Sequence, residues 1–120
     1  MKTILIIDDE ESHNQMLKST LELTHHYTCL IATCGAAGLE LVKQRQPDLV
    51  LLDINMPGED SLAILRQIKA IAPTLPVAML TAVIDKDVAK ACFAAGAYEY
   101  LTKPVTSEHL ETTLLVKLLE

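Results

Sequence analysis

The sequence lacks the cysteine framework and the long apolar runs that would place it among secreted or membrane proteins. It has three cysteines, an odd number without a C-x-x-C spacing, which indicates neither disulfides nor a cysteine metal site. We expect Cys29, Cys34 and Cys92 to be free thiols that pack as small core residues. The first apolar run ends at Asp8, too short for a signal peptide, and no later run could cross a bilayer. A cytoplasmic protein without membrane contact is therefore expected.

A cluster of basic residues is also missing. The formal charge is −6, and the 10 lysines and arginines are spread along the chain. Nucleic-acid binding needs a positive surface for the phosphate backbone, so we expect no direct binding to DNA or RNA. Linkers, internal repeats and low-complexity stretches are missing as well. Because half of the 120 residues are hydrophobic, we expect residues 1–120 to form one domain with a full core.

Short apolar runs alternate with segments of helical periodicity along the whole chain. The periodicity is clearest where Val88, Ala91, Cys92 and Ala95 recur at i, i+3, i+4 and i+7. This alternation predicts an α/β fold with a parallel sheet covered by helices on both faces. The predicted strands are Thr3–Ile7, Tyr27–Ala32, Leu49–Asp53, Val77–Thr81 and Tyr98–Leu101.

Polar residues follow the predicted strands at their carboxyl ends. Right-handed crossovers bring these ends to one edge of a parallel sheet, which is the edge where ligands bind in open α/β folds. The residues expected there are Asp8, Asp9, Asp53, Thr81 and Lys103. Carboxylates held close together repel one another and favour a hard divalent cation, and Mg²⁺ with a phosphoryl group fits best. An aspartate can attack phosphorus, while a lysine and a hydroxyl can neutralise the phosphoryl oxygens.

Four short motifs resemble the receiver domains of two-component response regulators, the CheY-like superfamily. They are Asp8-Asp9 after an apolar strand, Asp53-Ile54-Asn55-Met56-Pro57, Thr81-Ala82 and Lys103-Pro104. The resemblance implies a flavodoxin-like, doubly wound (βα)5 fold with strand order 2-1-3-4-5. It also implies a signalling switch, not an enzyme, that accepts a phosphoryl group on Asp53 from a histidine kinase or a histidine phosphotransfer protein and slowly dephosphorylates itself.

The resemblance further assigns a role to each matching residue. Asp8, Asp9 and Asp53 would hold Mg²⁺ together with the backbone carbonyl of Asn55. Lys103 would pair with the phosphoryl group, helped by a cis Lys103–Pro104 bond. Thr81 would move toward the phosphoryl group, and Tyr100 would rotate inward as the linked switch residue.

The chain departs from the family pattern after Pro57. The family usually has a glycine four residues later, where this chain has Ser61, and Gly58 lies nearer the proline. We therefore expect a different shape for this loop, with the chemistry unchanged. Asn55 and Val83 are expected to tune the lifetime of the phosphoryl group.

Structural explanations compete with some of these assignments. Asp8 and Asp9 could cap a helix, and Tyr100 could be an ordinary packing residue. Neither catalysis nor phosphate donation is assigned to the histidines, which are expected to be structural or solvated: His13, His25, His26 and His109.

Two other functions fit the sequence less well. An aspartyl-phosphate hydrolase would need a D-x-D motif on the first strand, which Asp8-Asp9-Glu10 does not provide. A flavin-binding module would need hydroxyls and free N–H groups after the first strand, where this chain has acids.

The last helix carries extra apolar residues, Leu115, Val116 and Leu119. We therefore expect the face formed by the fourth helix, fifth strand and fifth helix to dimerise or to bind an output domain upon phosphorylation.

Overall fold

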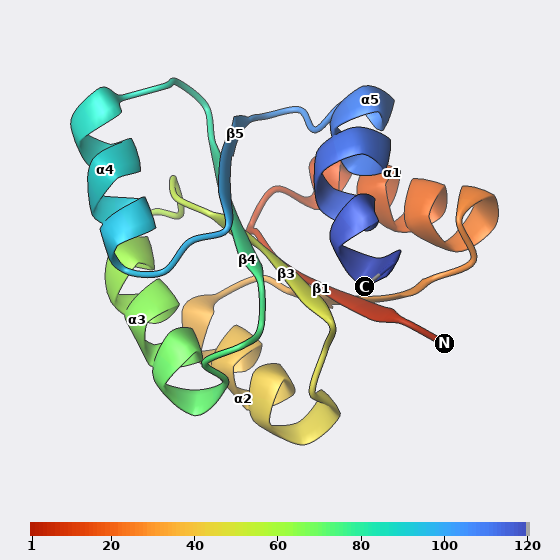
Figure 1. The fold of residues 1–120 in the computed structure, drawn as a ribbon, viewed down its shortest axis with the longest axis horizontal. Coiled ribbons are helices and arrows are strands. Elements are labelled where there is room, and N and C mark those ends of the chain that lie inside the picture. The colour runs from red at the N-terminus through yellow and green to blue at the C-terminus, as the bar shows by residue number, and fades with distance from the viewer. Residues whose placement is uncertain (120) are drawn as a thin grey trace.

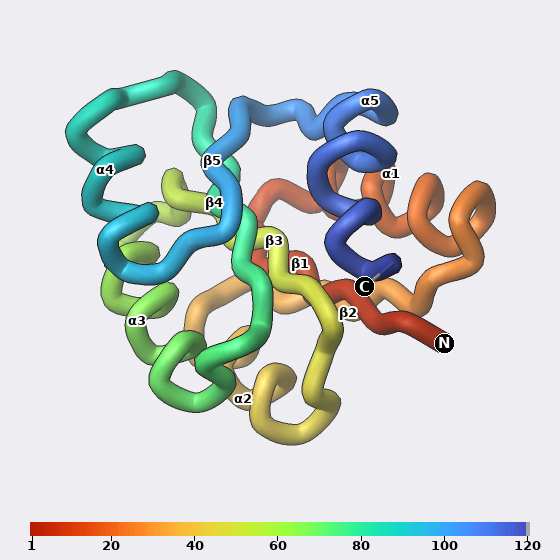
Figure 2. The backbone as a smooth tube through the Cα atoms, in the orientation of Figure 1, coloured from red at the N-terminus to blue at the C-terminus, as the bar shows by residue number. Residues whose placement is uncertain are grey.

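Five parallel strands form the sheet at the centre of the molecule (Figure 1). The structure is a computed structural model that describes residues 1–119. The strands are β1 (Thr3–Ile7), β2 (Thr28–Ala32), β3 (Leu49–Asp53), β4 (Val77–Thr81) and β5 (Glu99–Thr102). Their order across the sheet is β2-β1-β3-β4-β5, which confirms the predicted topology and can be followed along the tube in Figure 2.

The inner strands are buried on both faces, and the edge strands are not. Every residue of β3 and β4 is buried, as expected for a parallel sheet that helices cover on both sides. The two edge strands begin one residue later than predicted. Tyr27 lies outside β2 because its amide donates to the carbonyl of Leu21 and not to β1. At the other edge, β5 extends to Thr102, which pairs in register with Thr81.

Helices lie in two layers, one on each face of the sheet (Figure 1). One layer holds α2 (Gly35–Arg45), α3 (Ser61–Ile71) and α4 (Lys86–Ala94). The other holds α1 (Glu11–Ser19), which continues as the π-helical segment η1 (Thr20–Thr24), and α5. The α5 helix (Ser107–His109) continues as the π-helical η2 (Leu110–Leu114) and the 3-10 helix η3 (Leu115–Leu119). Among residues 1–119, none of these helices has the length and apolar character needed to cross a membrane.

The cysteines divide between core and surface. Cys29 and Cys92 are buried, one in the core beneath α1 and α5 and the other beneath α2, α3 and α4. Cys34 is exposed, so its predicted place in the core was wrong. It precedes the first residue of α2, where the chain turns from the strand edge into the helix and leaves the side chain in solvent.

The strand register brings the predicted polar residues to one edge of the sheet. Ile7 pairs with Leu52, and Asp53 pairs with Leu80, so the ends of β1, β3 and β4 lie level with one another. Backbone hydrogen bonds continue past the strand ends, from the Lys103 amide to the Thr81 carbonyl at 2.8 Å among others. These bonds fix the loops that leave this edge.

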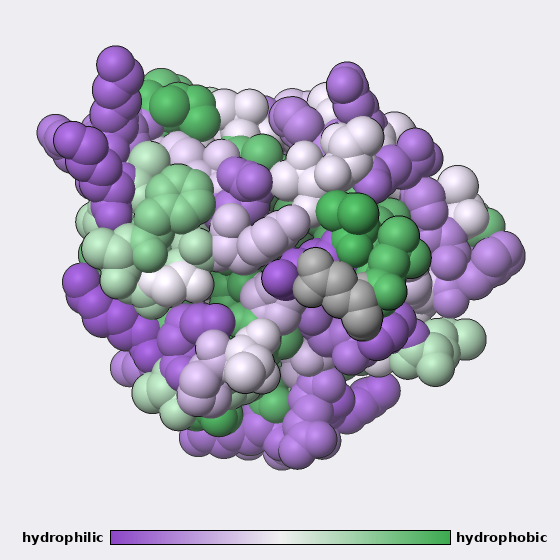
Figure 3. All heavy atoms as spheres, viewed as in Figure 1, coloured by the Kyte–Doolittle hydropathy of each residue, from purple (hydrophilic) through white to green (hydrophobic). Residues whose placement is uncertain are grey.

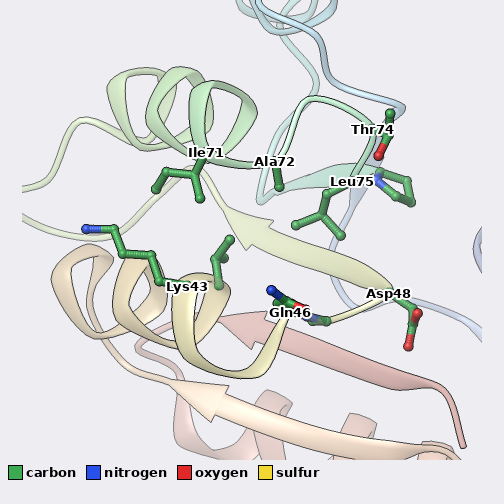
Figure 4. A pocket seen from close by; sticks show the side chains of 10 residues that line it. Lys43, Gln46, Asp48, Ile71, Ala72, Thr74 and Leu75 are labelled. Carbon is green, nitrogen blue, oxygen red and sulfur yellow. The ribbon is translucent and has the colours of Figure 1, made fainter.

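A pocket of about 360 Å³ lies at the opposite edge (Figure 4). It is lined by the C-terminal ends of α2 and α3, with Lys43 and Ile71 facing each other across it, and by the residues that lead into β3 and β4. Because the predicted functional residues follow the other ends of the strands, this pocket is separate from them.

Candidate functional site

Three carboxylates converge at the carboxyl edge of the sheet. Asp8 follows β1 and is 0% exposed, and Asp53 ends β3 and is 1% exposed. Asp9 is exposed, yet one oxygen from each of Asp8, Asp9 and Asp53 lies within 4.8 Å of the others. Asp9 and Asp53 border a pocket of about 580 Å³ that is also lined by Asn55, Ala82 and Lys103. This oxygen-only donor set fits Mg²⁺, which takes one or two carboxylates and completes its shell with water and phosphate oxygens.

Lys103 reaches into this acidic cluster from the loop after β5. Its Nζ atom lies 2.9 Å from Asp8 Oδ2, 2.8 Å from Glu10 Oε1 and 3.7 Å from Asp53 Oδ2. The peptide bond between Lys103 and Pro104 is cis, as the family resemblance implied. The ammonium group therefore neutralises part of the charge of the cluster.

The two buried carboxyls have opposite pKa shifts. Burial alone would raise the pKa of Asp8, but hydrogen bonds from His13 and the Glu10 amide, together with Lys103, lower it to about 2. Burial and the charge of Asp8 raise the pKa of Asp53, and the Asn55 amide and Lys103 offset this only in part. A cation bound beside Asp53 would therefore favour its ionised form.

Hydrogen bonds join the ends of β3 and β4 at the rim of the pocket. The side-chain carbonyl of Asn55 accepts from the Ala82 amide at 2.8 Å and lies 3.3 Å from Thr81 Oγ1. The Thr81 hydroxyl also lies 2.9 Å from the Val83 carbonyl oxygen. Asn55 thus contacts Thr81 and Ala82 through its side chain. The sequence prediction concerned a different group, the backbone carbonyl of Asn55 as a ligand of Mg²⁺.

Tyr100 lies apart from the carboxylates, within the core beneath α2, α3 and α4. The residue is 8% exposed, and its hydroxyl accepts a hydrogen bond from the Asp85 amide at 3.2 Å. The side chain already faces inward in this structure. Asp85 caps α4, so Tyr100 contacts the segment between β4 and α4.

The Ser61 side chain holds the backbone that follows β3. Its hydroxyl lies 2.7 Å from the Asp53 carbonyl oxygen and 3.3 Å from that of Ile54, both of which accept from it. The side chain is buried at the first residue of α3. Nearby, Gly58 takes up the turn with a φ of 75°. A serine hydroxyl thus holds the carbonyl of Asp53 where the family usually has a glycine.

The sequence prediction missed that His13 contacts the candidate site. The sequence predicts a structural or solvated residue, but its Nδ1 atom lies 3.2 Å from Asp8 Oδ2, within the candidate site. Beside it, the Asn14 side-chain amide donates to the Asp8 carbonyl at 2.8 Å. The sequence held a clue, because His13, Leu17 and Leu21 are four residues apart and share one apolar face of the helix.

A family model for the response regulator receiver domain matches residues 4–115. The transcriptional regulatory protein ZraR of Escherichia coli O157:H7 is 38% identical over 111 residues, covering 92% of this chain and 25% of ZraR. The DNA-binding transcriptional regulator NtrC of Escherichia coli K12 is 41% identical over 101 residues, covering 84% of this chain and 21% of NtrC. The chain therefore spans about a quarter of the length of these relatives.

Solved structures give the same result. A response regulator receiver domain protein from Clostridium thermocellum superposes with a TM-score of 0.88 at 35% identity, covering 98% of this chain and 94% of that one. The chemotaxis protein CheY4 of Vibrio cholerae superposes with a TM-score of 0.84 at 26% identity, covering 99% and 96%. Members of this family are phosphoacceptors and not conventional enzymes, and an acidic cluster such as Asp8, Asp9 and Asp53 is typical of their Mg²⁺ site. The chain belongs to the response regulator receiver domains of two-component signalling, with a CheY-like fold.

Proposed function

We propose that residues 1–120 form one receiver domain that is switched by phosphorylation of Asp53. A histidine kinase or a histidine phosphotransfer protein would donate the phosphoryl group, in a reaction that depends on Mg²⁺. The observation that carries this proposal is the position of Asp53: its buried carboxylate lies beside those of Asp8 and Asp9 and 3.7 Å from Lys103, in an open pocket. Mg²⁺, held by these carboxylates and the Asn55 backbone carbonyl, would neutralise charge on the phosphoryl oxygens.

The covalent step transfers the phosphoryl group from the donor histidine to Asp53. A carboxylate oxygen of Asp53 attacks phosphorus as the bond to the donor histidine nitrogen breaks, and that nitrogen keeps the electron pair. The product is an acyl phosphate on Asp53. Slow self-dephosphorylation follows when water attacks the same phosphorus, which releases inorganic phosphate and restores the carboxylate.

Lys103 and Thr81 act as the groups that receive the new charge. Lys103 exchanges part of its contact with Asp8 and Glu10 for the phosphoryl oxygens. The Thr81 hydroxyl and the Ala82 amide leave the Asn55 side chain and donate to the phosphoryl group. This movement shifts the segment between β4 and α4, whose Asp85 amide contacts Tyr100, so Thr81 and Tyr100 form the switch.

The output surface is proposed to be the face of α4, β5 and α5. Figure 3 shows apolar side chains over α4 and over η3, which continues α5, and the exposed apolar residues there include Val88, Phe93, Val116 and Leu119. Such exposed residues favour association with a second copy or with an output domain. The relatives are named as transcriptional regulators and are about four times longer, so an output domain is a natural partner. We propose a cytoplasmic protein whose receiver neither enters a membrane nor contacts nucleic acid directly.

Acetyl phosphate with Mg²⁺ is expected to add one phosphoryl group to the protein. The adduct should be absent when EDTA removes the metal, because the carboxylates of the site then repel the incoming anion. Intact mass spectrometry measures the addition. Borohydride reduces an acyl phosphate to the alcohol, so homoserine at position 53 locates it. An adduct that forms equally well in EDTA, or that maps to another residue, would contradict the proposal.

Beryllofluoride, which mimics the phosphoryl group, is expected to raise the sedimentation coefficient of the protein with Mg²⁺. Phe93→Ser removes an exposed aromatic ring from α4 and should abolish this increase. Leu23→Ser is the control, since Leu23 is also a large exposed apolar residue but lies on η1. A sedimentation coefficient that beryllofluoride leaves unchanged would argue against self-association through this face.

A further inference from the structure

We propose that His13 is a positioning residue that joins the metal-binding carboxylate of Asp8 to the loop following Lys103. The inference rests on the proposed function, because it concerns the residue that would hold Mg²⁺. His13 lies on α1, is 6% exposed, and has a neighbour on each side of its ring. Its Nδ1 atom lies 3.2 Å from Asp8 Oδ2, and its Nε2 atom lies 3.4 Å from the Val105 amide nitrogen.

The two partners define how the ring is protonated. A carboxylate oxygen accepts, so Nδ1 carries the hydrogen that is donated to Asp8. The Val105 amide donates, so Nε2 presents its lone pair. A neutral imidazole of this one tautomer satisfies both neighbours, and it bridges Asp8 to Val105, which lies 92 positions after His13 in the chain.

The bond to Asp8 matters most when Lys103 leaves. At present Asp8 Oδ2 contacts both His13 and Lys103, while Oδ1 accepts from the Glu10 amide at 2.9 Å. In the proposed mechanism Lys103 turns toward the phosphoryl group. His13 is then the side chain that keeps the Asp8 carboxylate oriented toward the metal, as outer partners of metal-ligating carboxylates commonly do.

The bond to Val105 extends this effect to α5. Val105 is buried and packs in the same core cluster as Leu110 and Leu114. It follows Lys103 by two residues, so the loop is attached to Asp8 twice, once through the ammonium group and once through the imidazole. A shift of Asp8 on metal binding is therefore passed through the ring to the loop that leads into α5.

A second metal site is the main alternative role for His13. Ligand atoms of Asp8, Glu10 and His13 lie within 4.8 Å of one another. However, the Lys103 ammonium already lies 2.9 Å from Asp8 and 2.8 Å from Glu10. A cation at this position would have to displace a lysine that compensates the same charge, so the positioning role accounts better for the geometry.

Three variants separate the two hydrogen bonds of the ring. His13→Asn places an amide donor near the Nδ1 position and keeps the contact with Asp8. His13→Gln places an amide oxygen near the Nε2 position and keeps the contact with Val105. His13→Leu fills the space and removes both contacts. Mg²⁺ titration of the unphosphorylated protein, followed by amide NMR, measures the affinity and the response of Val105 in each variant.

His13→Leu and His13→Gln are expected to weaken Mg²⁺ binding about 10- to 100-fold, whereas His13→Asn should bind within a few-fold of the wild type. The Val105 amide resonance should shift on Mg²⁺ binding in the wild type and lose that shift in His13→Asn. If His13→Leu does not fold, the comparison of His13→Asn with His13→Gln carries the test alone.

The outcomes distinguish this inference from the proposed function. Wild-type protein that does not bind Mg²⁺ would remove the proposed function and this inference together. Wild-type protein that binds Mg²⁺ while His13→Asn and His13→Gln bind equally well, with the same Val105 shift, would overturn the role of His13 alone.

Discussion

Lys103→Met is expected to lower the free energy of unfolding of the metal-free protein by about 2–3 kcal/mol, because it leaves buried carboxylates without their cation. The Lys103 side chain is mostly buried, 13% exposed, and its ammonium group contacts Asp8, whose side chain has no exposed surface. The loss of stability should be smaller than for a fully enclosed ion pair, because the Glu10 side chain is exposed and the pocket is open to water. Urea unfolding followed by circular dichroism in EDTA measures the change.

Mg²⁺ is expected to reverse most of this loss. Without Lys103 the metal has no competitor for the Asp8 carboxylate, so the variant should bind Mg²⁺ more tightly and gain more stability from it than the wild type does. Labelling by acetyl phosphate should nevertheless be lost or greatly slowed, since the phosphoryl oxygens lack their lysine. The variant thus separates metal binding from phosphoryl transfer.

Lys90→Met is the control for the loss of a lysine. Lys90 is exposed on α4, so its replacement should change stability by no more than about 0.5 kcal/mol and should leave the Mg²⁺ dependence unchanged. If Lys103→Met is as stable as the wild type in EDTA, the ammonium group does not compensate the acidic cluster.

The sheet could be predicted well because burial and pattern agree along its inner strands. The apolar runs Thr3–Ile7, Leu49–Asp53 and Val77–Thr81 are continuous, and each ends at a polar residue or directly before one, so their bounds were predicted correctly. The edge strands β2 and β5 are only partly buried, and their patterns mark the ends less sharply. This is why both predictions there were displaced by one residue.

The position of the candidate site could also be predicted, because it follows from topology. Parallel strands place their carboxyl ends together, so Asp8, Asp53 and Lys103 had to meet once the strands were known. His13 and Ser61 differ, since each acts on the site through a partner. A histidine on an apolar stripe is normally a core residue, and a serine at the start of a helix is normally a cap. Only the packing of α1 and α3 against the sheet reveals their contacts.

Acid sensitivity of the fold follows from the two buried carboxyls. The pKa of Asp8 is lowered to about 2, so its contribution to stability is present above the unfolded value of 3.8 and is lost as the pH falls toward 2. Asp53 has the opposite sign. Its pKa is raised above the unfolded value of 3.8, so its ionised form destabilises the metal-free fold at neutral pH. This cost begins to shrink as the pH falls through the raised pKa and is gone only below 3.8.

Asp53→Asn is expected to abolish the phosphoryl adduct completely while making the metal-free protein more stable at neutral pH. The amide cannot form an acyl phosphate, and it removes a buried negative charge that lies next to Asp8. Its stability advantage over the wild type should narrow on acidification, because the wild-type carboxyl then becomes neutral as well. Intact mass measures the first effect, and urea unfolding at several pH values in EDTA measures the second.

Two further variants make this test specific. Asp87→Asn removes an exposed carboxylate at the start of α4, away from the acidic cluster, and should keep both the adduct and the wild-type pH profile. Asp8→Asn should also lose the adduct, since it removes a metal ligand, yet it should lower stability at neutral pH because the carboxylate it replaces is held by His13, Lys103 and the Glu10 amide. Opposite effects on stability with the same loss of labelling would identify Asp53 as the acceptor and Asp8 as its support. An adduct that persists in Asp53→Asn would assign the acceptor to a different residue.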